Sequence, residues 1–246
     1  MKTVTINKHE IKIYDSIEDL SIVRFHKYNK FLLIDSGVGS DLQDVTNHIN
    51  RAIKYIDTDS KLAKIELSNL LQNIHLINEE LSPKYLAYSA LVCEIDGKLV
   101  TDLSDDGLRQ VHEKLNDIPI SFIDRFIEAV KKKMDTELTL YFPVLFEDSG
   151  TKEYFARLKE RTLLLLNSII EGNDNGKKIK QIDNFLLSLA KPKIFSGSES
   201  TEIQYDKQFE DMILMLRQNT GSNPSEMTVL QFYNAFEYLK KQMKAK

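Results

Sequence analysis

The sequence predicts an α+β fold that is predominantly α-helical, with an N-terminal β-hairpin and a second short hairpin. Three observations predict this class. Glycine and proline are scarce, with 9 and 5 among 246 residues, which favours long regular elements over a sandwich with many turns. Apolar residues recur at helical spacing along most of the chain. Two short stretches alternate with the period of a strand instead.

The N-terminal hairpin is predicted from two alternating stretches on either side of a polar turn. Val4 and Ile6 precede the turn at 7–9, and Ile11 and Ile13 follow it. A lone hairpin is only marginally stable in water. We therefore expect this hairpin to pack on another element of the fold.

The second hairpin is predicted at 91–100, where Asp96 and Gly97 form a favoured two-residue turn between apolar stretches. A third extended segment is predicted just before the acidic, glycine-containing stretch at 147–150, because the apolar residues there alternate. The alternating residues are Leu138, Leu140, Phe142 and Val144.

The remaining chain is predicted to be helical, with ends marked by capping residues. Pro83 suits the first position of a helix, and Thr228 with Gln231 can form a capping box. The expected helices lie at 16–37, 42–56 and 62–77, from 83, from 104 and from 121, and at 154–170, 182–189, 205–217 and 228–243.

The domain organisation is predicted from a stretch of serine and glycine at 196–200, which has the composition of a flexible linker. The chain is then divided into a helix-rich main domain with small β elements at 1–195, a linker at 196–202, and a C-terminal helical arm at 203–246.

Charge and cysteine content exclude several classes of protein. The net charge is −4, and nucleic-acid binding generally needs a positive field, so we expect nucleic acid only in incidental proximity. The single cysteine, Cys93, cannot form an internal disulfide, which favours a reducing compartment. The longest apolar stretch, at 163–170, is far shorter than the roughly 20 residues that span a bilayer, so we expect no membrane association.

One candidate catalytic motif is the Asp35-Ser36-Gly37 stretch after an apolar run, which resembles the turn of an aspartic protease. Such a site needs two carboxylates that share a proton on a β-rich frame. Helical periodicity lies on both sides of Asp35, so the alternative is a helix end with Gly37 as its left-handed residue.

A candidate metal site has the spacing of a calcium-binding EF-hand loop, in which oxygen ligands recur at fixed positions around a glycine at Gly107. The alternative is that a serine caps a helix whose first turn carries the acidic residues. The candidate ligands are Asp102, Ser104, Asp106 and Glu113. Elsewhere the histidines show no metal spacing and the glycine-rich stretch at 172–178 lacks the spacing of a phosphate-binding loop, so we predict no cofactor.

The C-terminal helix at 228–243 is amphipathic and rich in aromatic residues. Two interpretations remain open from the sequence. The helix can fold back onto its own core, or it can dock on a neighbouring subunit, because aromatic side chains are good interface anchors. The candidate interface residues are Val229, Phe232, Tyr233, Phe236 and Leu239.

Four stretches resemble proteins of tailed bacteriophages. The stretches at 15–20, 24–29 and 35–41 (DSIEDL, RFHKYN and DSGVGSD) are similar to uncharacterised proteins of crAss-like phages of Bacteroidetes hosts. The stretch at 223–232 (NPSEMTVLQF) looks like the ends of phage tail-assembly proteins. None of these stretches is a defined functional signature, so the resemblance transfers no site residues.

The resemblance implies a structural role in the virion, for a protein made in the host cytoplasm. Among such roles we predict a non-enzymatic head–tail connector or portal-adaptor ring, a cyclic homo-oligomer in which identical chains make head-to-tail contacts and the ring contacts the portal or an adjacent tail ring. The alternatives are a tail-assembly chaperone, which is absent from the finished particle, and a calcium-binding or hydrolytic enzyme.

Overall fold

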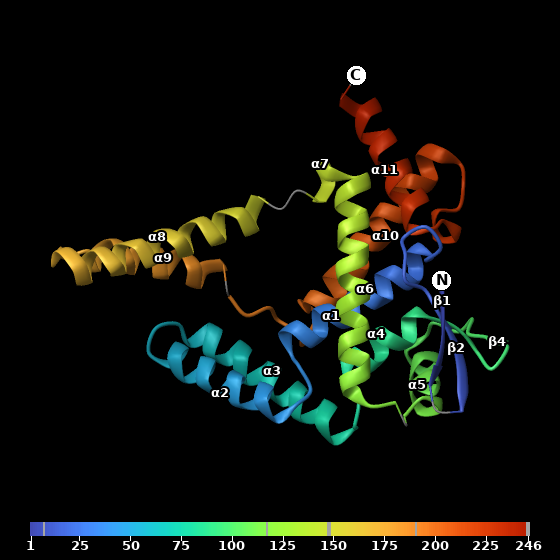
Figure 1. Ribbon diagram of the computed structural model, residues 1–246, viewed down its shortest axis with the longest axis horizontal. Coiled ribbons are helices and arrows are strands. Elements are labelled where there is room, and N and C mark those ends of the chain that lie inside the picture. Colours follow the sequence, from blue (N-terminus) through green and yellow to red (C-terminus); the bar gives the residue numbers. More distant parts are fainter. Residues whose placement is uncertain (7, 117, 147–148, 190, 245–246) are drawn as a thin grey trace. The chain divides into compact units, whose positions relative to one another are not determined.

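The computed structural model describes residues 1–6, 8–116, 118–146, 149–189 and 191–244 (Figure 1). It is mostly helical with one small sheet, so the predicted α+β class is confirmed. The chain forms two compact units, one of residues 1–142 with 193–246 and the other of residues 143–192. We describe each unit by itself.

The two predicted hairpins are both present and form one antiparallel sheet in the order β1-β2-β3-β4. Strand β2 pairs with β3, with Ile11 opposite Ile95, so each hairpin supplies the partner that the other needs. Asp96 and Gly97 have φ values of 50° and 79°, the left-handed backbone that a tight hairpin turn requires. The strands are β1 (Lys2–Ile6), β2 (His9–Ile13), β3 (Val92–Ile95) and β4 (Lys98–Leu99).

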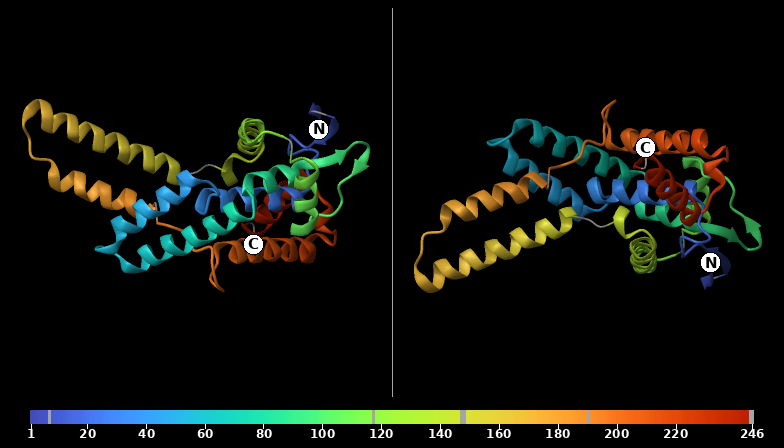
Figure 2. Two further views of the ribbon diagram at one scale, coloured as in Figure 1. Left: turned by 90° about the horizontal axis from the view of Figure 1, so that it is seen from below. Right: turned by 90° about the horizontal axis from the view of Figure 1, so that it is seen from above.

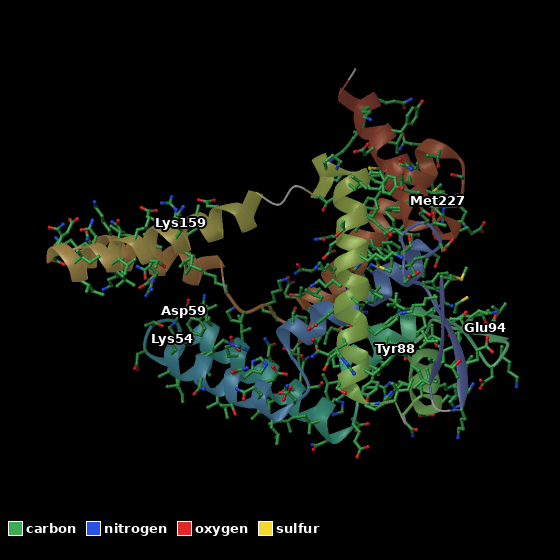
Figure 3. The ribbon with its side chains drawn as sticks, in the orientation of Figure 1. Lys54, Asp59, Tyr88, Glu94, Lys159 and Met227 are labelled. Atoms are coloured by element: carbon green, nitrogen blue, oxygen red, sulfur yellow. The ribbon has the colours of Figure 1, made fainter. Side chains whose placement is uncertain are left out.

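Helix α1 (Ile22–Gly37) is in contact with α4, α10 and α11, and α4 is in turn in contact with α5 and α6 (Figures 1 and 2). Tyr28 and Phe31 on α1 are buried. Tyr88 on α4 is also buried and meets the ring of Phe126 on α6 edge-on, 5.4 Å between centroids (Figure 3). The other helices are α2 (Leu42–Ile56), α3 (Ser60–Asn78), α4 (Pro83–Leu91), α5 (Asp105–Lys114), α6 (Ile120–Tyr141), α10 (Thr201–Thr220), η1 (Pro224–Glu226) and α11 (Val229–Lys244).

Arg24 on α1 links the helical core to the sheet. Its side chain is 7% exposed, and its guanidinium donates hydrogen bonds to the carbonyl oxygens of Ala90 and Val92, at 3.1 and 2.8 Å, and of Val100. The guanidinium also lies 5.5 Å from the centroid of the Tyr14 ring. A buried charge is tolerated only when it is well hydrogen-bonded, so this arginine fixes where α1 meets both ends of the second hairpin.

The third extended segment, predicted at 138–144, is wrong. Helix α6 continues to Tyr141, and α7 (Pro143–Phe146) follows it. Leu138 is buried, whereas Leu140 is 75% exposed, so the apolar residues do not share the face of a strand. Buried residues recur every three or four positions up to Leu138, so the longer helical period decided the structure.

The predicted domain boundaries are also wrong. The segment at 193–196 is bound to α3, because Asn69 Nδ2 donates to the Lys193 carbonyl at 2.9 Å and the Ser68 and Ser196 hydroxyls lie 2.7 Å apart. Phe195 is buried. Residues 203–246 consequently belong to the larger unit, and the separate unit is the internal stretch 143–192.

The smaller unit is a helical hairpin of α8 (Ser149–Glu171) and α9 (Gly176–Leu189), preceded by α7. Ile182 is buried between the two long helices, and Arg161 Nε donates to Asp183 Oδ1 at 2.5 Å. In the part of the chain that the structure describes, the helices are all too short or too polar to cross a membrane.

Replacing Arg24 with methionine should lower the free energy of unfolding by about 3 kcal/mol, since it leaves the buried carbonyl groups of Ala90 and Val92 and the partly buried one of Val100 without their donor. Urea unfolding of the purified chain measures this. Arg125→Met is the matched control, because Arg125 is exposed and donates to Ser121 within its own helix. If Arg24→Met lowers the free energy of unfolding by no more than Arg125→Met does, Arg24 does not link α1 to the sheet as described.

Candidate functional site

The hairpin of α2 and α3 exposes an apolar surface, which we call the hairpin face. On α2 it is formed by Leu42, Ile49, Ile53 and Ile56, and on α3 by Leu67, Leu71 and Ile74. These side chains are 39–75% exposed. Scattered exposed leucines are ordinary, but aliphatic side chains that follow one another along two adjacent helices mark an interaction surface.

The residues buried on α2 and α3 are small, aromatic or polar, with no leucine or isoleucine among them, so the large aliphatic side chains lie outside. His48 on α2 and Glu66 on α3 are both buried, and His48 Nδ1 lies 2.7 Å from Glu66 Oε2. Arg51 Nε donates to the other carboxylate oxygen at 2.8 Å. The second ring nitrogen of His48 bonds the Val38 carbonyl at 2.8 Å. Each of these buried polar groups thereby has a partner, as burial demands.

Electrostatics favours a charged carboxylate at this position. Burial opposes ionisation of Glu66, yet the hydrogen bonds from His48 and Arg51 outweigh it and hold the pKa of Glu66 below its usual value. The Glu66 carboxylate therefore binds α3 to α2 through two donors on neighbouring turns.

The exposed rows of the two helices lie on one side of the hairpin. Ile49 directly follows His48, and Leu67 directly follows Glu66, so each exposed row is rotated by about 100° from the buried row of its helix. Because α2 and α3 run antiparallel, the same sense of rotation brings both rows to the same side (Figure 1). The result is one continuous apolar surface two helices wide.

Local sequence explains where the two helices begin. Asp41 caps α2 by accepting a hydrogen bond from the Asp44 backbone N–H at 2.8 Å, and Asp59 caps α3 by accepting from Lys61 and Leu62. Figure 3 labels Asp59 next to the turn and Lys54 on the last turn of α2.

The helices α2 and α3 were predicted correctly from their apolar periodicity, but their exposed face was not. The usable signal is a second row at helical spacing on each helix that lacks leucine and isoleucine and includes His48 on α2 and Glu66 on α3.

A second apolar surface lies on the smaller unit. Leu163, Leu166, Ile169 and Ile170, on the last turns of α8, are 48–79% exposed. The helical hairpin of the smaller unit has only one interior, between α8 and α9. Its remaining aliphatic residues therefore have nothing to pack against within the unit. Figure 3 labels Lys159 earlier on α8, on a charged stretch of this helix.

The predicted interface on α11 is wrong for its central residues. Val229, Phe232 and Leu239 are 0%, 1% and 6% exposed, and they pack on their own chain. The Val229 N–H donates to the Leu20 carbonyl at 2.9 Å, and the Phe232 ring lies 6.4 Å from that of Phe209 on α10.

The same packing includes the rest of the predicted interface. Tyr233 contacts the Phe142 ring at 5.6 Å between centroids, and Tyr233 and Phe236 are half-buried. The capping box is confirmed, since Thr228 and Gln231 exchange hydrogen bonds at 3.0 and 3.3 Å. Aromatic residues on an amphipathic helix serve its own core as well as they serve an interface, so the sequence pattern alone could not separate the two.

Asp35 lies in the last turn of α1 and not on a strand-to-loop turn. Its carboxylate is 4.0 Å from Lys84 Nζ, which also pairs with Asp124 at 3.2 Å. Burial raises the pKa of Asp35 to about 6, although Lys84 opposes the shift. The left-handed residue of this helix end is Gly39, with φ of 68°, and not Gly37 as predicted.

The EF-hand-like residues do not surround a common point. Ser104 caps α5 by accepting from the Gly107 N–H at 3.1 Å, and Asp102 in turn accepts from the Ser104 N–H at 2.9 Å. Asp106 and Glu113 are seven residues apart on the helix, about 10 Å along its axis, whereas calcium ligands lie within about 2.6 Å of the ion. The predicted alternative, a capped helix, is the one observed. Among the described residues, no group of three His, Cys, Asp or Glu side chains could hold a metal ion.

Comparison with known proteins gives no relative: no family model, no curated protein and no solved structure matches this chain.

Replacing Phe232 with alanine should lower the free energy of unfolding by about 4 kcal/mol, because a fully buried aromatic ring is lost. The oligomeric state of the folded fraction should not change. Thermal or urea unfolding, followed by light scattering, measures both quantities. Tyr238→Ala on the same helix is the control, as Tyr238 is 61% exposed. If the Phe232→Ala variant is as stable as the natural chain but associates with itself more weakly, the interpretation of α11 as an interface would be restored.

Asp35→Asn should stabilise the chain at pH 7 by about 2 kcal/mol and have little effect at pH 4. The folded chain binds the Asp35 proton more tightly than the unfolded chain, so this residue's contribution to stability falls as the pH rises from about 4 to about 6. Urea unfolding of both proteins across this range measures the difference.

Proposed function

We propose that this protein is a structural subunit that acts by assembly with other protein chains. The observation that carries the proposal is the hairpin face, a surface of aliphatic side chains on two adjacent helices with polar side chains buried behind them. A helix normally turns its apolar side toward the core of its own chain. Here the buried side is occupied by His48 and Glu66, so the apolar side is left for a partner.

The size of the hairpin face supports this role. Its seven side chains expose an area on the order of 700 Å², which exceeds the largest apolar patch of a typical monomer, about 300–600 Å². It approaches the roughly 800 Å² that one partner contributes to a standard protein–protein interface. The exposed row on α8 adds a second, separate surface of the same chemistry.

The polar groups of the larger unit support binding over catalysis. His26, a buried histidine on α1, is stacked on Tyr205 and Phe209 and lies 2.8 Å from Asp206, so it serves to attach α10. Lys30 on the next turn pairs with Asp206 at 2.7 Å and with Glu202 at 2.9 Å. These buried polar side chains bind one another and leave no nucleophile or base directed at a substrate among them.

The more specific role that we propose is a subunit of a tailed-phage head–tail connector. Its support is the resemblance of the stretches at 15–41 and 223–232 to phage proteins, together with surfaces suited to repeated contacts between identical chains. In the virion such a subunit contacts the portal or a neighbouring tail ring. Mass spectrometry of purified virions tests this role, and absence of the chain from the particle would leave an assembly chaperone instead.

The full chain should form a concentration-dependent oligomer by light scattering, and Ile53→Glu with Leu71→Glu should shift it toward the monomer. Charge on the hairpin face costs several kcal/mol once that face is covered. Leu99→Glu is the matched control, since Leu99 is 67% exposed on β4, outside the face. A chain that stays monomeric at all concentrations, alone and with virion proteins, would contradict the proposal.

A further inference from the structure

The hairpin face has the geometry of half a four-helix bundle. Such a bundle packs four antiparallel helices around a shared apolar interior, and α2 and α3 supply two such helices with their apolar rows on one side. The two helices have 15 and 19 residues, which corresponds to lengths of about 22 and 28 Å. What this half lacks is a second two-helix layer of similar length.

The spacing of the rows matches helix-to-helix packing. On α2 the row passes from Leu42 to Ile49 by a full heptad and then to Ile53 and Ile56 in steps of four and three residues. On α3 the row runs through Leu67, Leu71 and Ile74, again in steps of four and three. This period of 3.5 keeps a row facing a neighbouring helix along its whole length.

The hairpin face itself contains only aliphatic side chains, and charged residues are confined to its border, where they include Lys54 and Asp57 at the C-terminal end of α2 and Lys64 on α3. Interface cores are depleted of charged residues in the same way and are surrounded by a polar rim. The apolar centre therefore favours a partner that presents an apolar face of its own.

We infer that the hairpin face is covered by the hairpin face of a second copy of this chain, so that the two hairpins complete a four-helix bundle. A second copy offers the missing layer with the required length, period and apolar centre. Two such faces bury an area on the order of 1,400 Å², within the range of stable interfaces, roughly 1,200–2,000 Å². The inference rests on the proposed assembly function and adds that the partner at the hairpin face is a second copy of this chain.

This contact is two-fold, because the same patch is used on both chains. A larger assembly made from such pairs contains an even number of copies. A cyclic ring closed by head-to-tail contacts has no two-fold interface, so the pairing of hairpin faces is a contact in addition to those that close the proposed connector ring.

Mixing variants of opposite charge tests the two-fold contact with the full chain. The acidic variant carries Ile49→Glu and Leu71→Glu, and the basic variant carries Ile49→Lys and Leu71→Lys. Each alone should associate with itself about a hundredfold or more weakly than the natural chain, because like charges meet across the interface. The equimolar mixture should regain association, and native mass spectrometry should show complexes with one chain of each kind.

Matched controls separate charge on the face from charge in general. Leu99→Glu and Leu99→Lys lie on β4, outside the hairpin face, at a side chain that is 67% exposed, and should leave self-association unchanged. Circular dichroism and thermal unfolding check that all variants remain folded, as expected for exposed positions.

Three outcomes would overturn the inference. If the acidic and basic variants each lose association but the mixture does not regain it, the face meets a different surface of the neighbouring copy, and the assembly function stands. If neither variant loses association, another protein or another segment covers the face. If the natural chain never associates, the proposed function fails as well.

Discussion

The carboxylate of Glu66 is the constraint on which the interaction surface depends. It is buried between α2 and α3, and an uncompensated charge there would be strongly destabilising. His48 and Arg51 compensate it from neighbouring turns of α2. These contacts fix the rotation of both helices about their axes, because any other rotation would separate the carboxylate from its donors. The aliphatic rows, one residue further along each helix, are thereby held in solvent.

The rest of the larger unit provides a rigid support for this hairpin. Arg24 joins α1 to the second β-hairpin through three backbone carbonyls, and the C-terminal helices close over the other side of α1. The aromatic stack of His26 with Tyr205 and Phe209 holds α10 in place. The side chains of Arg24 and His26 are thus engaged within the larger unit, whereas the aliphatic side chains of the hairpin face are exposed.

These features together favour assembly as the working principle of the molecule. An exposed row of leucine and isoleucine is unfavourable in water unless a partner covers it, so selection would remove it from a chain that acts alone. The hairpin face and the row on α8 both have this character, although they lie on separate units. Copies that pair through the hairpin face would retain the α8 row for a further contact, which is what an extended structural assembly requires.

The sequence alone determined the helices, the two β-hairpins and their turns, because these depend on local periodicity and on residues such as Gly97. It did not determine the end of α6, where the alternation at 138–144 also fits a helix, or the attachment of 193–196 to α3, which depends on hydrogen bonds from Ser68 and Asn69. Only the tertiary structure decided which amphipathic faces are covered. Val229 and Phe232 on α11 are buried, whereas Ile49 and Ile53 on α2 are exposed, although all four belong to similar apolar rows. The difference arises because burial is settled by distant neighbours, here Phe209 for one helix and the Glu66 carboxylate for the other.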